Sequence, residues 1–589
     1  MQTLEYRWDL TAFFPGVDSP EYRLACEAAG SKLDVIEKLF RQEGIMADGA
    51  DVSADLADKV FGLVNEAGDA VSLIKAYVGC LVAADSNDEA AQAADSASDD
   101  LEIRLRKVRT QFTAWAGARS SIPGQQAAEH EYFIRRARVR AAHMLGAAEE
   151  ALAADLSISG PMAWGKLHGI MGSQLKVEVD LPTGKETLPM SAVRNLAYDG
   201  DPVVRENAYF AELATWKSVE VPLSACLNGV KGAVNLLARK RRWDEALDES
   251  LFVSAIDRET LEAMLGAAKE FFPDFRRYLN AKARLLGKRK LPFYDIFAPV
   301  GEEAKIWTVD QAEAFVEETF RTFSDKLGDF AARAFREHWI DYMPRAGKQD
   351  GAFCCPFRGD ESRIMHNFKT SIKSVSTLAH ELGHGYHNTC TGPRTFLQSE
   401  TPMTLAETAS IFCETILKNA ALEEGTDTEN LTVLEASLCG SCQVVVDITS
   451  RFLFESEVFA KRGARELSPG ELCQAMLDSQ RATYGDGLDG DLLHPYMWAA
   501  KPHYYGLMSF YNYPYMFGLL FGLGLYAVYQ QEPKGFQARY DDLLSSTGLD
   551  DAAGLARRFG IDTRRPDFWR DSLLVIRADI DRFVKIAGS

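Results

Sequence analysis

The sequence predicts a mainly α-helical fold with a few small β elements. Residues from about 20 to 155 are rich in Ala, Leu, Glu, Lys and Arg and contain few prolines or glycines. Apolar residues recur there at helical spacing, for example from Leu33 to Phe40 and from Asp99 to Trp115. Segments with the composition of strands are short and few, so helices are expected to form most of the core.

The first helical region ends at Ser159-Gly160-Pro161, where glycine and proline interrupt the pattern. Apolar and polar residues then alternate from Leu175 to Leu181, and a turn follows at Pro182-Thr183-Gly184-Lys185. This pattern predicts a β-hairpin that ends around Met190.

Helical spacing returns at Ala192, and Asp201-Pro202 is typical of the start of a helix. We expect prolines to break the helical pattern at Pro273 and again at Pro292. Residues 351–369 have the composition of short strands. We therefore predict two domains: residues 1–195, helical with a β-hairpin, and residues 196–589, which contain the His380-Glu381-Leu382-Gly383-His384 motif described below.

The charge balance limits the possible partners. The chain has 65 Lys and Arg against 85 Asp and Glu, a net charge of −20. Such an acidic surface argues against nucleic acid or an anionic membrane as a main partner. The longest apolar run, Met516 to Tyr529, is shorter than the roughly 20 residues that a membrane helix needs. We expect neither nucleic acid nor membrane as a partner.

The N-terminal segment, Met1 to Leu10, lacks a basic start followed by an apolar run, so no signal peptide is expected. The ten cysteines are then expected to be reduced thiols, including the pair in Cys439-Gly440-Ser441-Cys442. These features predict a cytoplasmic protein.

The most informative motif is His380-Glu381-Leu382-Gly383-His384. Two histidines four residues apart lie one turn apart on a helix and can bind one metal ion from the same side. Glu381 lies between them and can accept a proton from a water bound to the metal. A helix capped by Thr370 or Ser371 would present this motif.

A catalytic zinc needs a third protein ligand and an open position for water. Glu407 follows His384 by 23 residues, early in an apolar segment where an unpaired carboxylate would be costly to bury. It is the predicted third ligand; the alternative is an ordinary charge in the first turn of a helix. Glu414 could bond a ligand histidine or form a surface ion pair. His387 is interpreted as structural or as a residue that supports a ligand, but not as a ligand itself.

These residues predict hydrolysis assisted by one Zn²⁺ ion. Zinc would lower the pKa of its bound water towards about 7, and Glu381 would activate that water and pass its proton to the leaving amine. Further hydrogen-bond donors are available in the segment 503–515, which contains a histidine and five tyrosines. Aromatic density of this kind also occurs in ordinary cores.

The motif residues, Pro402 to Ser410, Trp8-Asp9-Leu10, the region from Ser159 to Trp164 and the tyrosine-rich segment together resemble the oligoendopeptidase F family, relatives of thimet oligopeptidase. The resemblance implies a two-lobed, zincin-like metallopeptidase fold with a deep substrate channel. It implies that His380, His384 and Glu407 bind zinc and that Glu381 is the base. It also implies that His503, Tyr511 and Tyr515 stabilise the transition state.

The resemblance further implies a zinc-dependent endopeptidase that hydrolyses internal bonds of short, unstructured oligopeptides. The strand-like segment from Gly351 to Phe357 would bind an extended peptide by strand addition. Two alternatives stay open: a carboxypeptidase or dipeptidyl carboxypeptidase on a similar scaffold, and a zinc-containing peptide-binding protein without turnover. The sequence carries no prediction of oligomeric state.

Overall fold

A computed structural model describes residues 6–49, 51–301 and 305–588. The first five residues of the N-terminal segment used in the signal-peptide prediction lie outside this range. The chain forms two compact units, each assembled from separated segments. The first unit comprises Met1–His143, Lys305–Ala420 and Val528–Ile561, and the second comprises Met144–Ala304, Ala421–Ala527 and Asp562–Ser589. The predicted division at residue 195 is a different partition of the chain and stays a prediction.

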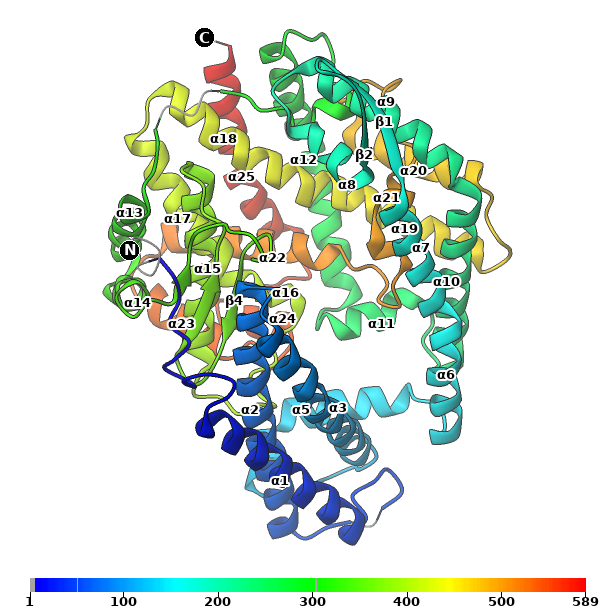
Figure 1. Cartoon of the computed structure of the whole chain (residues 1–589), viewed down its shortest axis with the longest axis vertical. Helices are drawn as coiled ribbons and strands as arrows, with labels where there is room; N and C mark the ends of the chain where they lie inside the picture. Colours follow the sequence, from blue (N-terminus) through cyan, green and yellow to red (C-terminus); the bar gives the residue numbers. More distant parts are fainter. Residues whose placement is uncertain (1–5, 50, 302–304, 589) are drawn as a thin grey trace. The chain divides into compact units, whose positions relative to one another are not determined.

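The first unit begins with a helical bundle whose three long helices run side by side (Figure 1). Ser19, Ser53 and Asp88 cap these helices through their side-chain oxygens. The buried apolar residues of the bundle form one core, as the helical spacing predicts. The five helices of this segment are α1 Pro20–Glu43, α2 Ala54–Ala84, α3 Glu89–Gly117, α4 Gln125–Glu129 and α5 Glu131–Ala142.

The rest of the first unit surrounds a three-stranded sheet of order β3-β5-β4. The strands are β3 Ile340–Asp341, β4 Phe353–Pro356 and β5 Ser362–Met365. β5 pairs in parallel with β3 and antiparallel with β4, so β4 forms an edge of this sheet. The helices are α13 Val309–Phe323, α14 Asp325–Arg336, α15 Ile372–Thr391, α16 Met403–Ala406, α17 Thr408–Glu424, α23 Phe536–Ser545 and α24 Ala552–Arg557. The strands predicted within 351–369 are confirmed, whereas the two-residue β3 was too short to predict.

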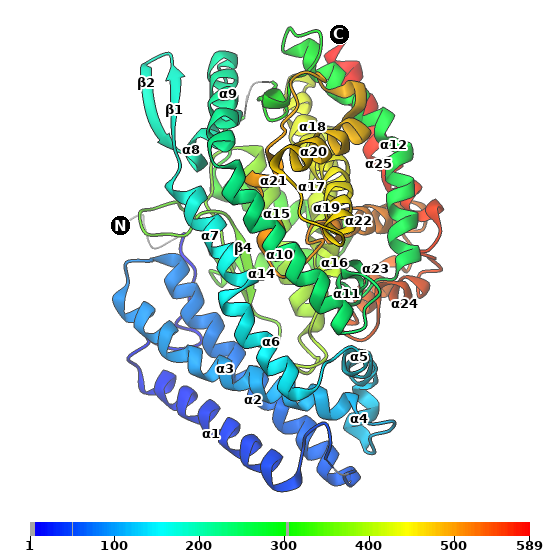
Figure 2. The same ribbon diagram turned by 90° about the vertical axis from the view of Figure 1, so that its right-hand side faces the viewer.

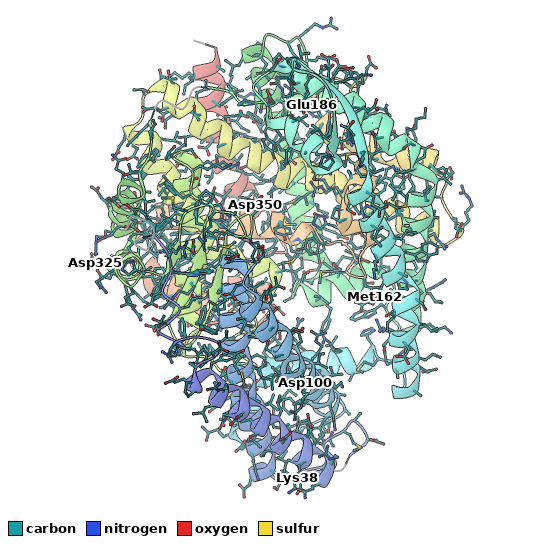
Figure 3. The ribbon with its side chains drawn as sticks, viewed as in Figure 1. Lys38, Asp100, Met162, Glu186, Asp325 and Asp350 are labelled. Atoms are coloured by element: carbon teal, nitrogen blue, oxygen red, sulfur yellow. The ribbon has the colours of Figure 1, made fainter. Side chains whose placement is uncertain are left out.

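The second unit contains the predicted β-hairpin, formed by β1 Lys176–Leu181 and β2 Gly184–Pro189. Val177 and Val179 on β1 are buried, and β1 packs beside α9 Pro202–Ser218 (Figure 2). Glu186 on β2 is exposed on the hairpin (Figure 3). Apolar and polar residues alternate along β1 because one face of the strand is buried and the other is solvated, as expected.

The remaining elements of the second unit are helical, and several begin or end where the sequence indicated. α6 ends at Ser159 and α7 begins at Pro161, on either side of the predicted break. The helices are α6 Ala147–Ser159, α7 Pro161–Gln174, α8 Met190–Asn195, η1 Leu196–Tyr198, α10 Glu220–Lys240, α11 Ala246–Val253, α12 Arg258–Leu285, η2 Phe293–Asp295, α18 Asp427–Cys442, η3 Gln443–Asp447, α19 Ile448–Arg462, α20 Pro469–Tyr484, η4 Gly485–Gly487, α21 Met497–Ala500, η5 Pro502–Tyr505, α22 Tyr513–Gln531 and α25 Pro566–Ala587.

The expected break at Pro273 is wrong, because α12 continues through this residue. An internal proline removes one helical hydrogen bond and costs about 3 kcal/mol. The flanking residues Phe271, Phe272 and Phe275 are buried, and α12 packs along α25. Burial of this apolar face offsets the local cost.

In the part of the chain that the structure describes, three helical stretches are long and apolar enough to cross a membrane when only length and composition are considered. They are Ala54–Ala84, Glu220–Lys240 and Asp427–Arg462, and about half of the most apolar window of each is buried inside the protein. Polar residues interrupt each stretch, so none of them is an unbroken apolar run. The predicted absence of a membrane partner stays a prediction.

Candidate metal centre

The motif histidines lie on α15, in the first unit. Of the two predicted caps, Thr370 and Ser371, it is Ser371 that caps this helix: its Oγ accepts a hydrogen bond from the backbone N–H of Ser374. Val375, Leu378 and Leu382 are fully buried and hold one face of the helix in the core. His380 and His384 project beside this apolar face and are partly exposed. Packing therefore fixes the helix and leaves both imidazoles accessible.

Glu407 lies at the junction between α16 and α17 rather than inside one continuous helix. Its Oε2 is 3.3 Å from His380 Nε2 and 3.4 Å from His384 Nε2. These three side chains converge, and their ligand atoms all lie within 4.8 Å of one another. Their role as metal ligands stays a prediction.

The separations of Glu407 from the two histidines fit a tetrahedral zinc ion. Ligands at about 2.0–2.2 Å from zinc in a tetrahedron are separated by about 3.3–3.6 Å. Both measured separations from Glu407 fall in this interval. Two imidazoles and one carboxylate are also the donor set of several catalytic zinc sites, in which the fourth position stays open.

A second layer of hydrogen bonds orients the donors. His380 Nδ1 lies 3.3 Å from Glu414 Oε2. Because a carboxylate only accepts hydrogen bonds, the ring donates through Nδ1. Its Nε2 is then free to bind a metal. Ser376 donates to the other oxygen of Glu414 at 3.2 Å. Ser410 donates to Glu407 Oε2 at 2.7 Å. Of the two readings left open for Glu414, the structure shows the contact with the histidine.

The electrostatics of the cluster favour a cation. Burial lowers the pKa of His380, but hydrogen bonds to Glu407 and Glu414 outweigh burial and raise that pKa to about 10. Burial would raise the pKa of Glu407, but the two histidines hold this pKa well below its usual value. Carboxylates placed in this way stabilise positive charge at the imidazoles, whether it is carried by a proton or by a metal ion.

Glu381 is buried beside the histidines, and burial raises the pKa of its carboxyl above the usual value. A carboxylate with a raised pKa is a stronger base, as general-base catalysis near neutral pH requires. His387, on the same helix, instead contacts Thr547 Oγ1 at 3.0 Å and is buried. This agrees with its structural interpretation.

His503, Tyr511 and Tyr515 lie in the second unit and form a contiguous group. The rings of His503 and Tyr511 stack with centroids 4.7 Å apart, and the hydroxyls of Tyr511 and Tyr515 are 3.1 Å apart. The structure thus joins these three residues to one another. Their action together with the donors of the first unit stays a prediction.

Comparisons with known proteins show the family and the fold of the chain. The profile of peptidase family M3 matches residues 195–574, and that of the oligopeptidase F N-terminal region matches residues 124–176. A Chlamydophila abortus protein whose assignment as a peptidase is provisional has the same fold, with a TM-score of 0.86, 18% identity and coverage of 99% of this chain and 98% of that chain.

Two relatives extend the comparison. Group B oligopeptidase PepB of Streptococcus agalactiae is 26% identical over 54% of this chain, and the match spans only about half, 53%, of PepB. An oligoendopeptidase F homolog of Lactococcus lactis is 21% identical over 88% of this chain and 86% of its own length. The helical fold and the His-Glu-x-x-His cluster define the class of protein as a metallopeptidase. Within that class, the chain belongs to peptidase family M3.

Proposed function

We propose that this protein is a zinc-dependent endopeptidase that hydrolyses internal bonds of short, unstructured peptides. The observation that supports the proposal most strongly is the convergence of His380, His384 and Glu407 beside the buried Glu381. The names of its relatives, oligopeptidase and oligoendopeptidase F, favour peptides as the substrate class.

His380, His384 and Glu407 would hold the metal. When bound, a zinc ion supplies a Lewis acid that polarises the scissile carbonyl and lowers the pKa of a water molecule. Glu414 and Ser410 keep the donors oriented through the hydrogen bonds described above.

Glu381 would accept a proton from the attacking water and deliver it to the leaving amide nitrogen. His503, Tyr511 and Tyr515 would donate hydrogen bonds to the substrate oxygen on which negative charge develops. The edge strand β4 would pair with the backbone of an extended peptide, because its outer edge has no partner strand within the sheet described above.

Replacing Glu381 by Gln tests the role of the base. The change removes the proton acceptor but preserves size, so we expect turnover to fall by about 10²–10⁴-fold while zinc content stays the same. Peptide hydrolysis and metal content, measured on the same preparation, check this expectation. Unchanged turnover would rule out Glu381 as the base, and loss of zinc would show that the substitution disturbs the site instead.

Blocked peptides distinguish the proposal from its alternatives. A peptide acetylated at its N-terminus and amidated at its C-terminus should be cut at internal bonds, and mass spectrometry identifies the products. An obligatory carboxypeptidase or dipeptidyl carboxypeptidase would leave the amidated peptide intact and cut its free-acid form. Tight binding of zinc and peptide without any cleavage would support the non-hydrolytic alternative.

A further inference from the structure

The second unit contains a cavity of about 350 Å³ that the proposed peptidase mechanism does not use. Ligand sites for small organic molecules have volumes of about 300–1,000 Å³. All residues that line the cavity belong to the second unit. They come from α8, η1, α9, the region of η2, η3, and the segment 494–501.

Lys501 supplies a cationic group to this cavity. In the described part of the chain, no carboxylate lies within ion-pair distance of its ammonium group, and no hydrogen bond of that group is found. Burial, together with the nearby charge of Arg451, lowers the pKa of Lys501 to about 8. A partly desolvated ammonium of this kind is stabilised by an anion placed beside it.

His494 provides an independent indication of a ligand. This residue is only 2% exposed and lines the cavity. Its Nε2 lies 3.4 Å from Glu212 Oε1, whereas its Nδ1 has no hydrogen-bond partner among the described residues. Buried polar atoms are normally hydrogen-bonded, so an unpartnered ring nitrogen beside a cavity indicates a missing partner.

The other charged groups of the cavity wall already have partners. Arg205 donates to Asp295 at 2.8 Å. Arg194 lies 3.3 Å from Glu212, and Asp447 is ion-paired with Arg451 on the next turn. After these pairs are formed, Lys501 is the one cation of the lining that has no counter-charge among the residues that the structure describes. The balance of charge therefore favours an anionic ligand carrying a single negative charge.

One wall of the cavity is a π-helical segment, η3, which carries Gln443 and Asp447. π-Helical turns are rare and occur frequently at functional sites, because they displace side chains from the regular helical positions. Here the segment directs an amide, which can both donate and accept, to the cavity beside the charged groups.

Aromatic side chains form the apolar part of the lining. The rings of Tyr198 and Phe297 are in contact, with centroids 4.9 Å apart, and Tyr209 and Tyr294 are 5.3 Å apart. Phe293 contacts the ring of His494 at 5.2 Å. A ligand for this cavity would therefore combine one anionic group with an apolar or aromatic part.

We propose that this cavity binds a small organic carboxylate with an apolar side group, such as an N-acylated amino acid. Lys501 would pair with the carboxylate, and Gln443 would donate a hydrogen bond to it. His494 Nε2 faces the Glu212 carboxylate, so Nδ1 would accept a hydrogen bond from the amide N–H of the ligand. Tyr198 with Phe297 would contact the apolar group. This binding site goes beyond the proposed peptidase function and uses none of its residues.

Isothermal titration of the zinc-loaded full chain with N-acetylphenylalanine tests the proposal, with N-acetylphenylalaninamide as the uncharged analogue. The acid should bind at least 10-fold more tightly than the amide. Lys501→Met should weaken binding of the acid at least 10-fold, and Lys501→Arg should preserve it within about threefold because the charge remains. The matched control, Lys217→Met, removes an exposed lysine of α9 that lies outside the cavity and should have no effect.

Equal affinities for acid and amide, or equal affinities of the wild type and Lys501→Met, would overturn the proposal. If Lys501→Met fails to fold, Tyr198→Ala replaces it as the test variant, because Tyr198 is 56% exposed and tolerates truncation. Tyr198→Ala should weaken binding of N-acetylphenylalanine at least fivefold, and unchanged affinity would contradict the assignment.

A carboxylate can also bind a catalytic metal, so a metal-site variant separates the two sites. His384→Ala removes a proposed zinc ligand in the first unit and should leave the affinity for N-acetylphenylalanine unchanged. Loss of binding in His384→Ala, with full binding in Lys501→Met, would overturn the cavity assignment and place the ligand at the metal. Failure of the peptidase proposal would appear instead in the Glu381→Gln experiment.

Discussion

At the scale of single residues, the candidate metal centre includes side chains outside the three proposed metal ligands. Glu414 accepts from His380 and from Ser376, and Ser410 donates to Glu407. Such contacts select the tautomer and orientation of each donor, so that less conformational freedom is lost when a metal binds.

Glu414→Gln should therefore weaken zinc binding. The substitution keeps a hydrogen-bond acceptor near His380 but removes the negative charge, so we expect zinc affinity to fall by about 10-fold, the lower end of the range for such partners. Competition with a chromogenic chelator measures the change.

Glu423→Gln is the matched control. This exposed glutamate lies near the end of the same helix, α17, and the substitution should leave zinc affinity unchanged. Equal zinc affinities of Glu414→Gln and the wild type would show that the contact with His380 has no influence on the metal.

At the scale of elements, the site requires a close approach of α15 to the start of α17. A Cβ atom on Gly383 would lie 2.6 Å from the Cα of Ser410 and 2.7 Å from the carbonyl oxygen of Ala409. Only glycine fits this contact without displacing backbone. The glycine inside the motif thus lets the helix that carries both histidines meet the segment that carries Glu407.

Gly383→Ala should push these two segments apart. We expect overpacking to lower the free energy of unfolding by about 1–3 kcal/mol and to weaken zinc binding, because Glu407 moves relative to the histidines. Thermal unfolding and zinc titration measure the two effects.

Gly79→Ala is a control with the same chemical change in another helix of the first unit. A Cβ at Gly79 has nothing within 4 Å, so this substitution should be neutral or stabilise the protein by about 0.5–1 kcal/mol. If Gly383→Ala matched Gly79→Ala in stability and kept full zinc affinity, the close approach would not be required.

At the scale of the whole molecule, buried ion pairs make the stability depend on pH. Glu212, in the second unit, is buried beside His494 and Arg194. Burial would raise the pKa of Glu212, but His494 and Arg194 outweigh burial and lower it to about 2. In the unfolded chain the pKa of a glutamate is about 4.3.

Since the folded pKa is the lower one, Glu212 stabilises the fold fully above about pH 4.3, and this stabilisation is lost as the pH falls through about 2. Glu212→Gln should lower the free energy of unfolding by about 3 kcal/mol at pH 6, and the difference from the wild type should shrink below pH 4. Urea unfolding midpoints across this pH range test the expectation.

Glu206→Gln removes an exposed glutamate from the same helix, α9, and should leave the midpoints unchanged at every pH. The free energies of unfolding of Glu212→Gln and the wild type could instead differ by the same amount from pH 6 to pH 2.5. This result would show that the pKa of Glu212 is the same in the folded and the unfolded chain.

Sequence reasoning predicted the helices, the hairpin and the convergence of His380, His384 and Glu407. It left open whether Glu414 meets His380, because helical spacing defines a face but not the direction of a side chain. It was wrong at Pro273, where the burial of α12 against α25 outweighs the tendency of proline to break a helix. It also gave no sign of the cavity around Lys501, whose lining residues are scattered from 191 to 501.

The sequence by itself determined the features that depend on local periodicity: mainly helical elements, two histidines one turn apart, and a glutamate between them. Only the tertiary structure decided which distant groups meet them. The chain passes between its two compact units five times, so contacts within each unit join residues hundreds of positions apart. Local spacing carries no information on such contacts, because they arise from the packing of complete elements against one another.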